Sequence, residues 1–310
     1  DCLQPLDAVF SSEELEVIGA GSIGPSATSY IYEDHQWALP LDAATQVMAC
    51  RPDLLGENVP VTWGEVQALS ERTGKVGVSL AGPHAFLSFL SICAALGEEP
   101  GRVDAKMLVS DAVGQAAYSI LSRLAARSPA VTADKNPIGI LNHLRSADDV
   151  ALVPLIYGYV NYSAPNAGHK VTFHNAPRMV PGGRPGSTIG GTGIGISRRC
   201  QVTPELKAHL LWLLSAEAQA GFIPDHEGQP SRRDAWHDQQ VNTAWGQFYA
   251  NTADTLEAAY VRPRFDGYIA LQTVGSVALR AAMARGETAQ AAVTELNVLY
   301  KKHRKSGAAV

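Results

Sequence analysis

The feature that most constrains the fold is an alternation of strand-like and helix-like segments along the 310-residue chain. The segment WALPLDAATQVM, at 37–48, begins as an extended run, and the segment 62–74 is strongly marked as a helix. Alternation of this kind is typical of α/β proteins. We therefore expect an α/β fold, without internal repeats or low-complexity tracts.

Capping residues mark the helix ends. Thr62 is a suitable N-cap, Glu65 follows three residues later as in a capping box, and Gly74 closes the helix. Thr203 and Pro204 open a second helix as N-cap and first helical residue. Further helices are expected at 84–97, at 110–127, after Pro137, and in two stretches separated at Gly286, with short strands at 76–82 and 171–177.

Composition and charge argue against several classes of protein. With 46% hydrophobic residues, the chain can form one large core or two mid-sized cores. The net charge of -5, with basic residues scattered except at 301–305, argues against nucleic-acid binding. The apolar stretch 150–160 is interrupted by Pro154 and Gly158 and is too short to span a membrane. If the protein is exported, we expect its signal peptide to have been removed or to lie outside this sequence.

The cysteines and histidines do not form a metal-binding or catalytic pattern. Cys2, Cys50, Cys93 and Cys200 are far apart and lack CxxC spacing, so zinc is not expected. Cys93 lies in an apolar segment and is expected to be buried, while Cys2 or Cys200 could pair in an oxidising compartment. The nine histidines are dispersed, and GxSxG, HExxH and Walker sequences are absent. We predict a protein that is not an enzyme and uses neither metal nor cofactor.

The segment IGGTGIGISRR, at 189–199, raises the question of a phosphate-binding loop. Such a loop leads directly from a strand into a helix N-terminus. Here the Thr203 cap lies eight residues beyond Gly195, and no GK[ST] sequence follows. Because Gly190 and Gly191 have no side chains, they indicate a place where the backbone closely approaches a ligand or forms a hinge. The alternative is a bulge where a strand begins.

Six motifs occur in order along residues 30–285: WALPLDAATQVMACRPDLL, VPVTWGEVQAL, the glycine pair leading into GIGIS, TPELKAHLLWLLSAEAQ, QPSRR and VRPRFDGY. This order resembles the extracellular solute-binding proteins of ABC importers, in particular the large sugar-binding family that includes maltose-binding protein. The resemblance implies a type II periplasmic-binding-protein fold, in which two α/β lobes are joined by crossover strands and close on a ligand. In that family the chain returns between lobes at the glycine pair, whose bare backbone would face the cleft.

The resemblance also implies lobe boundaries. The N-terminal lobe would comprise 1–42 and 191–248, and the C-terminal lobe 43–190 and 249–310. Relatives carry a signal peptide and the first strands and helix of the N-terminal lobe before the point that matches the start of this chain. We therefore expect an N-terminal lobe that lacks its first strands, either because the chain is truncated or because its beginning is omitted.

Several residues at the implied lobe junctions are candidates for ligand binding, because sugars are held by planar polar groups and aromatic faces. Asp42, at the first crossover, could accept from two hydroxyls or could be a turn or N-cap residue. His84 stands where relatives present an aromatic side chain, or is a solvent-facing residue of a first helical turn. Tyr157 and Tyr159 lie where the family brings aromatic residues into the cleft, and strand alternation predicts that only one points there.

The remaining candidates lie in the second half of the chain. Gly191 belongs to the glycine pair, and Thr192 stands where many relatives carry a tryptophan, so one stacking platform is missing. Arg264 and Tyr268 precede a helix of the C-terminal lobe. Arg264 could bind a carboxylate or phosphate bidentately, which would favour an acidic ligand, or could form a surface ion pair with Asp266 or Glu257.

We therefore predict the substrate-binding component of an ABC importer, which captures a small carbohydrate or sugar-derived solute by hinge closure. The alternatives are a small carboxylate or other anion as ligand, and delivery to a chemoreceptor. The expected partner is an ABC permease of the inner membrane. The protein is expected to be a monomer in the periplasm or outside the cell, associated with the membrane through that partner.

Overall fold

The structure is a computed structural model that describes residues 2–56, 58–102, 104, 106–164 and 168–306. The strands are β1 (Leu3–Gln4), β2 (Ile31–Tyr32), β3 (His35–Gln36), β4 (Leu39–Cys50), β5 (Leu152–Tyr157), β6 (Thr172–His174), β7 (Ile189–Ile194) and β8 (Ile196–Ser197). The α-helices are α1 (Ser12–Gly21), α2 (Pro52–Leu55), α3 (Trp63–Thr73), α4 (His84–Ala95), α5 (Asp111–Ala125), α6 (Pro137–Leu144), α7 (Pro204–Leu213), α8 (Ile223–Asp225), α9 (Arg233–His237), α10 (Gln239–Ala244), α11 (Phe248–Glu257), α12 (Tyr268–Arg285) and α13 (Ala289–Ser306).

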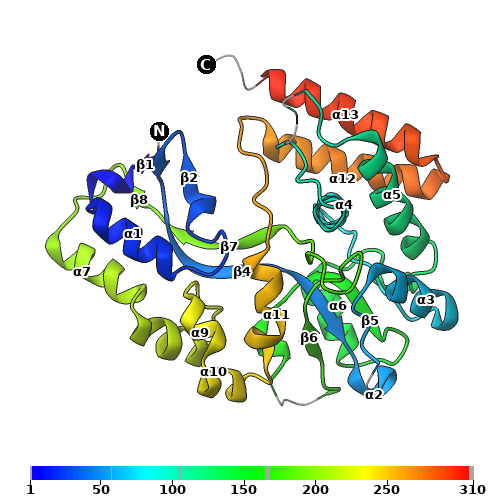
Figure 1. Cartoon of the computed structure of the whole chain (residues 1–310), viewed down its shortest axis with the longest axis horizontal. Helices are drawn as coiled ribbons and strands as arrows, with labels where there is room; N and C mark the ends of the chain where they lie inside the picture. Colours follow the sequence, from blue (N-terminus) through cyan, green and yellow to red (C-terminus); the bar gives the residue numbers. More distant parts are fainter. Residues whose placement is uncertain (1, 57, 103, 105, 165–167, 307–310) are drawn as a thin grey trace.

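Strand β4 connects the two halves of the molecule. Its first part, 39–45, pairs antiparallel with β7, and its last part, 46–50, pairs antiparallel with β5 and β6. The register shifts between Pro40 and Asp42 and again between Val47 and Ala49. One strand is therefore shared by two pairings that lie on either side of the centre of the molecule (Figure 1).

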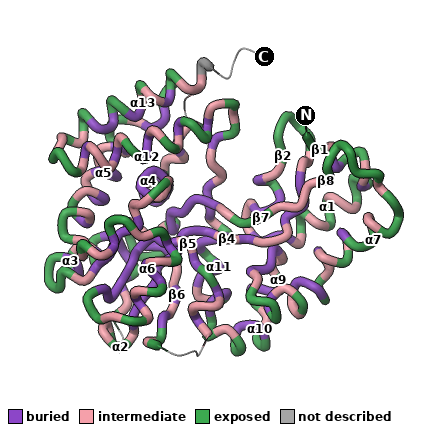
Figure 2. Tube along the Cα trace, turned by 180° about the vertical axis from the view of Figure 1, so that it is seen from behind, coloured by how far each residue is buried: buried purple, intermediate pink, exposed green. Residues whose placement is uncertain are grey.

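The two sides differ in size. In Figure 1, α1, α7, β1, β2 and β8 form a smaller lobe at one end of β4, while α3, α4, α5, α12 and α13 form a larger one at the other. The smaller lobe has a modest core, whose fully buried members are Leu6, Phe10, Leu39, Ile196, Leu210 and Leu214. The larger lobe is built around α4, which is almost wholly buried and appears purple in Figure 2.

A second large core covers the middle sheet. Val47 of β4, Phe173 of β6 and Phe248 of α11 are packed together with residues from α6. The same cluster includes Trp236 and Val241 from α9 and α10. These two short helices therefore pack against the sheet that β4 shares with β5 and β6, close to the point where β4 passes between lobes.

The helix ends predicted from capping residues are confirmed. Thr62 caps α3 with a complete capping box to Glu65, and Gly74 ends it in the left-handed conformation. Thr203 caps α7, and Gly286 separates α12 from α13. These boundaries are set by local hydrogen bonds, so residues near each end determine them.

The strand predicted at 76–82 is wrong. Val76 forms only an isolated bridge to Leu152, and the backbone N–H of Val78 is satisfied by the Ser128 hydroxyl instead of a strand. The segment is buried up to Ser79 because Val76 and Val78 belong to the same core as α4 and α5, and among the described residues no strand continues the ladder.

The four cysteines are free. Cys93, as expected, is fully buried, as is Cys50, while Cys2 and Cys200 are exposed. In the described part of the chain, no helix combines the length and the apolar character needed to cross a bilayer.

Candidate ligand-binding site

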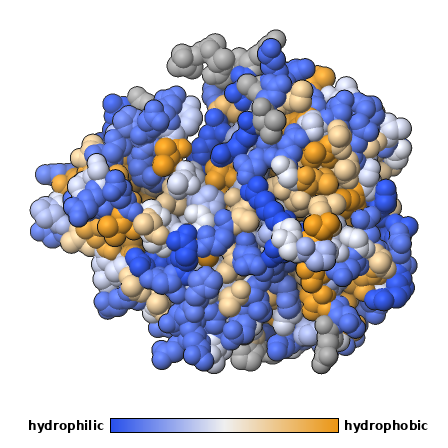
Figure 3. Space-filling model, in the orientation of Figure 1, coloured by the Kyte–Doolittle hydropathy of each residue, from blue (hydrophilic) through white to orange (hydrophobic). Residues whose placement is uncertain are grey.

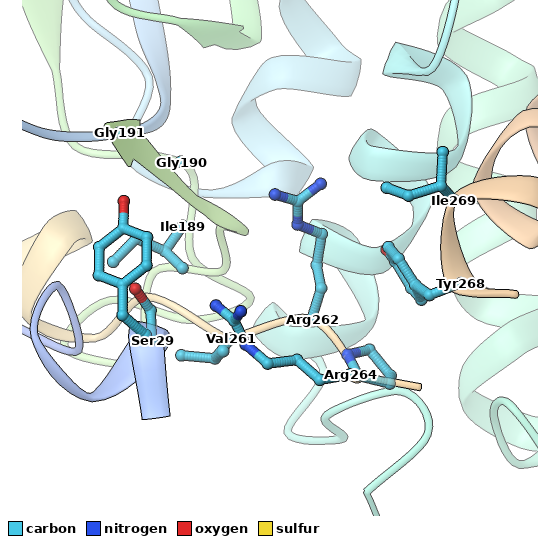
Figure 4. Close-up of a pocket in the computed structure, with 11 residues that line it drawn as sticks. Ser29, Ile189, Gly190, Gly191, Val261, Arg262, Arg264, Tyr268 and Ile269 are labelled. Atoms are coloured by element: carbon cyan, nitrogen blue, oxygen red, sulfur yellow. The ribbon is translucent and has the colours of Figure 1, made fainter. Parts of the chain in front are cut away.

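Two adjoining pockets lie where β4 and β7 pass between the lobes, and both include Gly191. The arginine pocket has a volume of about 290 Å³ and is lined by residues that include Tyr30, Gly190, Gly191, Arg262, Arg264 and Tyr268. The tyrosine pocket has a volume of about 260 Å³ and is lined by residues that include Asp42, Tyr157, Tyr159, Gly191, Thr192 and Gln229. Figure 4 shows the arginine pocket.

Asp42 presents a carboxylate to the tyrosine pocket from the middle of β4. It pairs in register with Thr192 of β7, and its Oδ2 accepts a hydrogen bond of 3.2 Å from the Gln229 backbone N–H. The alternative of a turn or N-cap residue is therefore wrong. Burial raises the pKa of Asp42 from 3.8 to about 6, although the N–H groups of Gln229 and Thr192 act to lower it.

Both tyrosines line the same pocket, so the expectation that only one faces it is wrong. Residues two positions apart in an extended segment point to the same face, so Tyr157, the last residue of β5, and Tyr159 can both reach this pocket. The Tyr157 hydroxyl lies 3.2 Å from the Thr188 hydroxyl, whereas Tyr159 is 39% exposed. Tyr157 is thus held in place, whereas the partly exposed Tyr159 ring meets the Tyr162 ring edge-on, with centroids 6.5 Å apart.

The glycine pair allows β7 to lie close to Tyr157 and to β4. A Cβ on Gly190 would lie 2.7 Å from the Tyr157 ring, and one on Gly191, where φ is +99°, would lie 2.3 Å from the Asp42 carbonyl oxygen. The next helix after the glycine pair, α7, begins only at Pro204, so the segment lacks the strand–turn–helix geometry of a phosphate loop. The bare backbone lines both pockets.

His84 does not line either pocket among the described residues. It is the first residue of α4, and its ring meets that of Tyr157 edge-on, with centroids 6.0 Å apart. Its Nδ1 is buried without a hydrogen-bond partner, and burial lowers the pKa of His84. The alternative of a solvent-facing histidine is wrong, because the side chain lies behind Tyr157 and supports it.

Arg264 and Tyr268 face the arginine pocket from the segment that leads into α12. The Arg264 guanidinium lies over the ring of Tyr30, 6.0 Å from its centroid. No hydrogen bond or ion pair joins it to Asp266 or Glu257, and Glu257 is paired with Arg233 instead. The alternative of a surface ion pair at Arg264 is therefore wrong. Tyr268 is 7% exposed, and its buried hydroxyl has no hydrogen-bond partner among the described residues.

Comparison with solved structures identifies the fold. The chain is similar to an ABC transporter solute-binding protein from Agrobacterium radiobacter K84 in complex with ribitol, at 21% identity and a TM-score of 0.76, covering 97% of this chain and 80% of that one. It is similar to maltose-bound MalE3 from T. maritima, at 20% identity, a TM-score of 0.75 and the same coverage of 97% and 80%. The cyclic α-maltosyl-1,6-maltose binding protein from Arthrobacter globiformis matches at 15% identity and a TM-score of 0.80, covering 98% and 80%.

The chain has the type II periplasmic-binding-protein fold. No protein-family model matches the sequence, and no curated protein matches it. Two of these structures are described as binding proteins, and the third is described as maltose-bound.

The sequence did not predict several of the pocket residues, among them Gln229, Tyr30 and Arg262. Tyr30 comes from the turn before β2, and nothing near it in the sequence indicates that it faces Arg264. Arg262 also lines the arginine pocket. Its position two residues before Arg264, in the sequence RPR, could have indicated this role. Its Nη1 donates to Gln272 Oε1 at 2.8 Å.

One cluster outside the pockets has the composition of a metal site. Asp53, Asp148 and His169 place donor atoms within 4.8 Å of one another. The fully buried Arg51 donates to both carboxylates at 2.7 Å, so a side-chain cation already lies where a metal ion would bind. The cluster is explained by this ion pair.

Proposed function

We propose that the chain is the substrate-binding component of an ABC importer and captures a small polar solute, a carbohydrate or sugar derivative, between its lobes. The observation that carries the proposal is the pair of pockets at the crossover of β4 and β7, in a fold shared with solute-binding proteins. Similar structures are described with bound ribitol, maltose, α-D-tagatose or D-mannitol. The same class of solute suits pockets lined by aromatic rings and polar groups.

The proposed contacts divide between the two pockets. In the tyrosine pocket, Asp42 accepts hydrogen bonds from hydroxyls, Tyr159 stacks on the apolar face of a ring, and Tyr157 positions that surface. Gly191 and Thr192 offer backbone close to the ligand. Arg264 and Tyr268 contribute the donors of the arginine pocket, and His84 supports Tyr157 from behind.

The proposed setting follows from the same function. An ABC permease of the inner membrane would receive the solute, and the protein would work as a monomer in the periplasm or outside the cell. The lobes would comprise 1–42 with 191–248 and 43–190 with 249–310. Closure would bring Asp42 and the residues of the larger lobe around the ligand.

A ligand screen tests this function. Thermal denaturation is followed with pools of neutral sugars, polyols and sugar acids, and positive compounds are retained for native mass spectrometry. Binding to the folded state should raise Tm in a concentration-dependent way. Tyr159→Ala should weaken binding, whereas Trp212→Ala, which removes an aromatic side chain of 38% exposure outside both pockets, should leave it unchanged. Absence of a shift with every pool would contradict the proposal.

A further inference from the structure

The segment 261–264 carries two arginines, Arg262 and Arg264, in a chain whose net charge is -5. Arg262 and Arg264 line the arginine pocket on one side of this segment. A second hollow of about 490 Å³, on its other side, is lined by the same two arginines together with Arg102 and Arg304, and by a single acidic residue, Glu33. Figure 3 shows strongly hydrophilic side chains where the two lobes face each other.

In the part of the chain that the structure describes, Arg264 has no counter-ion. Within the described residues it makes neither a hydrogen bond nor an ion pair, and its contact is with the face of the Tyr30 ring. Burial, and then the neighbouring charge of Arg262, lower the pKa of Arg264. A guanidinium placed in this way presents its N–H donors to the pocket without using them.

The groups beside Arg264 are also donors. Arg262 donates a hydrogen bond from Nη1 to the uncharged side chain of Gln272. Its guanidinium lies over the Tyr268 ring, 6.0 Å from the ring centroid. The unpartnered Tyr268 hydroxyl is turned toward Arg262 in Figure 4. Tyr268 also opens α12, an 18-residue helix with neither an acidic residue in its first turn nor a side-chain cap. The positive end of this helix therefore faces the same space.

Two guanidinium groups, one hydroxyl and a helix N-terminus thus converge without a paired carboxylate. Arginine binds carboxylates and phosphates through two parallel hydrogen bonds, and a partly desolvated site strengthens them. We propose that the arginine pocket binds the anionic group of the solute, a carboxylate or a phosphate, so that the ligand is an acidic carbohydrate derivative. This inference rests on the proposed function and narrows its ligand class.

Binding of defined probe pools tests the inference. The pools are neutral sugars and polyols, uronic and aldonic acids, sugar phosphates, and inorganic phosphate alone, each titrated by calorimetry at low and high salt. We expect an acidic pool to bind, with an affinity that falls as ionic strength rises. Preference for uronic and aldonic acids would identify a carboxylate, and preference for sugar phosphates a phosphate. Saturation by inorganic phosphate alone would show that the ligand is the free anion, and it would overturn the assignment to an acidic carbohydrate derivative.

Two substitutions locate the anion. Arg264→Gln should weaken binding of the acidic probe by roughly 30-fold or more, and Arg262→Gln should weaken it in the same direction. Arg285→Gln is the matched control, because this arginine lies at the far end of α12, where it pairs with Glu287 at 2.8 Å. The Arg285→Gln protein should bind the acidic probe with the same affinity as the wild type.

The outcomes separate this inference from the proposed function. Tight binding of a neutral sugar or polyol, with acidic pools inactive, would overturn the anion site and leave the binding function standing. An acidic probe whose affinity is the same in wild type, Arg264→Gln and Arg262→Gln would also overturn it. If no pool binds at all, the proposed function fails, and the inference fails with it. If a substituted protein does not fold, the salt dependence of the wild-type affinity still tests whether the pocket binds an anion.

Discussion

At the residue scale, Arg51 shows how this protein accommodates a fully buried charge. Its guanidinium donates to the carboxylates of Asp53 and Asp148 and to the carbonyl oxygens of Leu144 and Ala147. These contacts tie the end of β4 to the turn after α6. Because every partner is polar, removal of the guanidinium would leave buried carbonyl groups without donors.

We predict that Arg51→Met lowers the free energy of unfolding by about 1–3 kcal/mol, because the buried carbonyl oxygen of Leu144 loses its donor, while the exposed carboxylates of Asp53 and Asp148 remain solvated. The measurement is urea denaturation. The matched control is Arg127→Met, since Arg127 forms an exposed pair with Glu71 at 3.6 Å. That change should cost less than about 1 kcal/mol. Equal effects of the two substitutions would contradict this account of Arg51.

Asp42 is expected to give stability a pH dependence. The pKa of Asp42 is about 6 in the folded protein, and its ordinary value is 3.8. At a pH between these two values, Asp42 is protonated in the folded protein and ionised in the unfolded chain. Stability should therefore fall as pH rises from about 4 to about 6, by about 1–2 kcal/mol after allowance for solvent access. Above that range the contribution is constant.

Asp42→Asn should remove this dependence, because the amide does not titrate. The free energy of unfolding is measured between pH 4 and 8, with Asp225→Asn, an exposed carboxyl, as control. The control should retain the wild-type slope. A slope that persists in Asp42→Asn would show that another group is responsible.

At the element scale, the crossover depends on how closely β4 and β7 approach. Gln46 of β4 is fully buried and accepts a hydrogen bond from Ser91 of α4 at 2.7 Å, while the Ser91 hydroxyl accepts one from the Thr188 N–H at 2.9 Å. This network fixes the larger-lobe end of the crossover. The bulge between Pro40 and Asp42 lies toward the smaller lobe and interrupts the ladder there.

Gly191→Ala tests the close approach of these strands. The substitution meets an unfavourable φ of +99° and a Cβ position 2.3 Å from the Asp42 carbonyl oxygen. Gly182→Ala is the control, since φ is +76° there but nothing lies within 4 Å. The control should cost about 1–2 kcal/mol, and Gly191→Ala about 1–3 kcal/mol more. Similar losses in chemical denaturation would show that β7 can move away from β4.

The sequence could predict what is decided locally. The ends of α3 and α7 follow from Thr62 and Thr203, because the capping hydrogen bonds involve residues three positions away. The strand predicted at 76–82 is wrong because a buried segment that pairs with no strand has the same apolar pattern as a buried strand. Part of the site followed from the resemblance, but the position of Tyr30 opposite Arg264 is set by tertiary packing, which no local pattern encodes.

At the scale of the whole molecule, two lobes share β4, and the proposed function requires them to enclose a solute where β4 crosses between them. The ligand can favour the closed form only by the difference between its affinities for the two forms. Arg262 and Arg264, on the segment before α12, and Asp42, on β4, belong to different elements around the crossover. A solute that bridges these groups would therefore stabilise closure.

The most direct test is small-angle X-ray scattering of the protein with and without a saturating concentration of a compound that raises Tm in the screen. The account predicts a smaller radius of gyration and a changed scattering profile with ligand, because the lobes close around it. Arg285→Gln should behave in the same way as the wild type. Identical profiles at proven saturation would contradict hinge closure as the mechanism of capture.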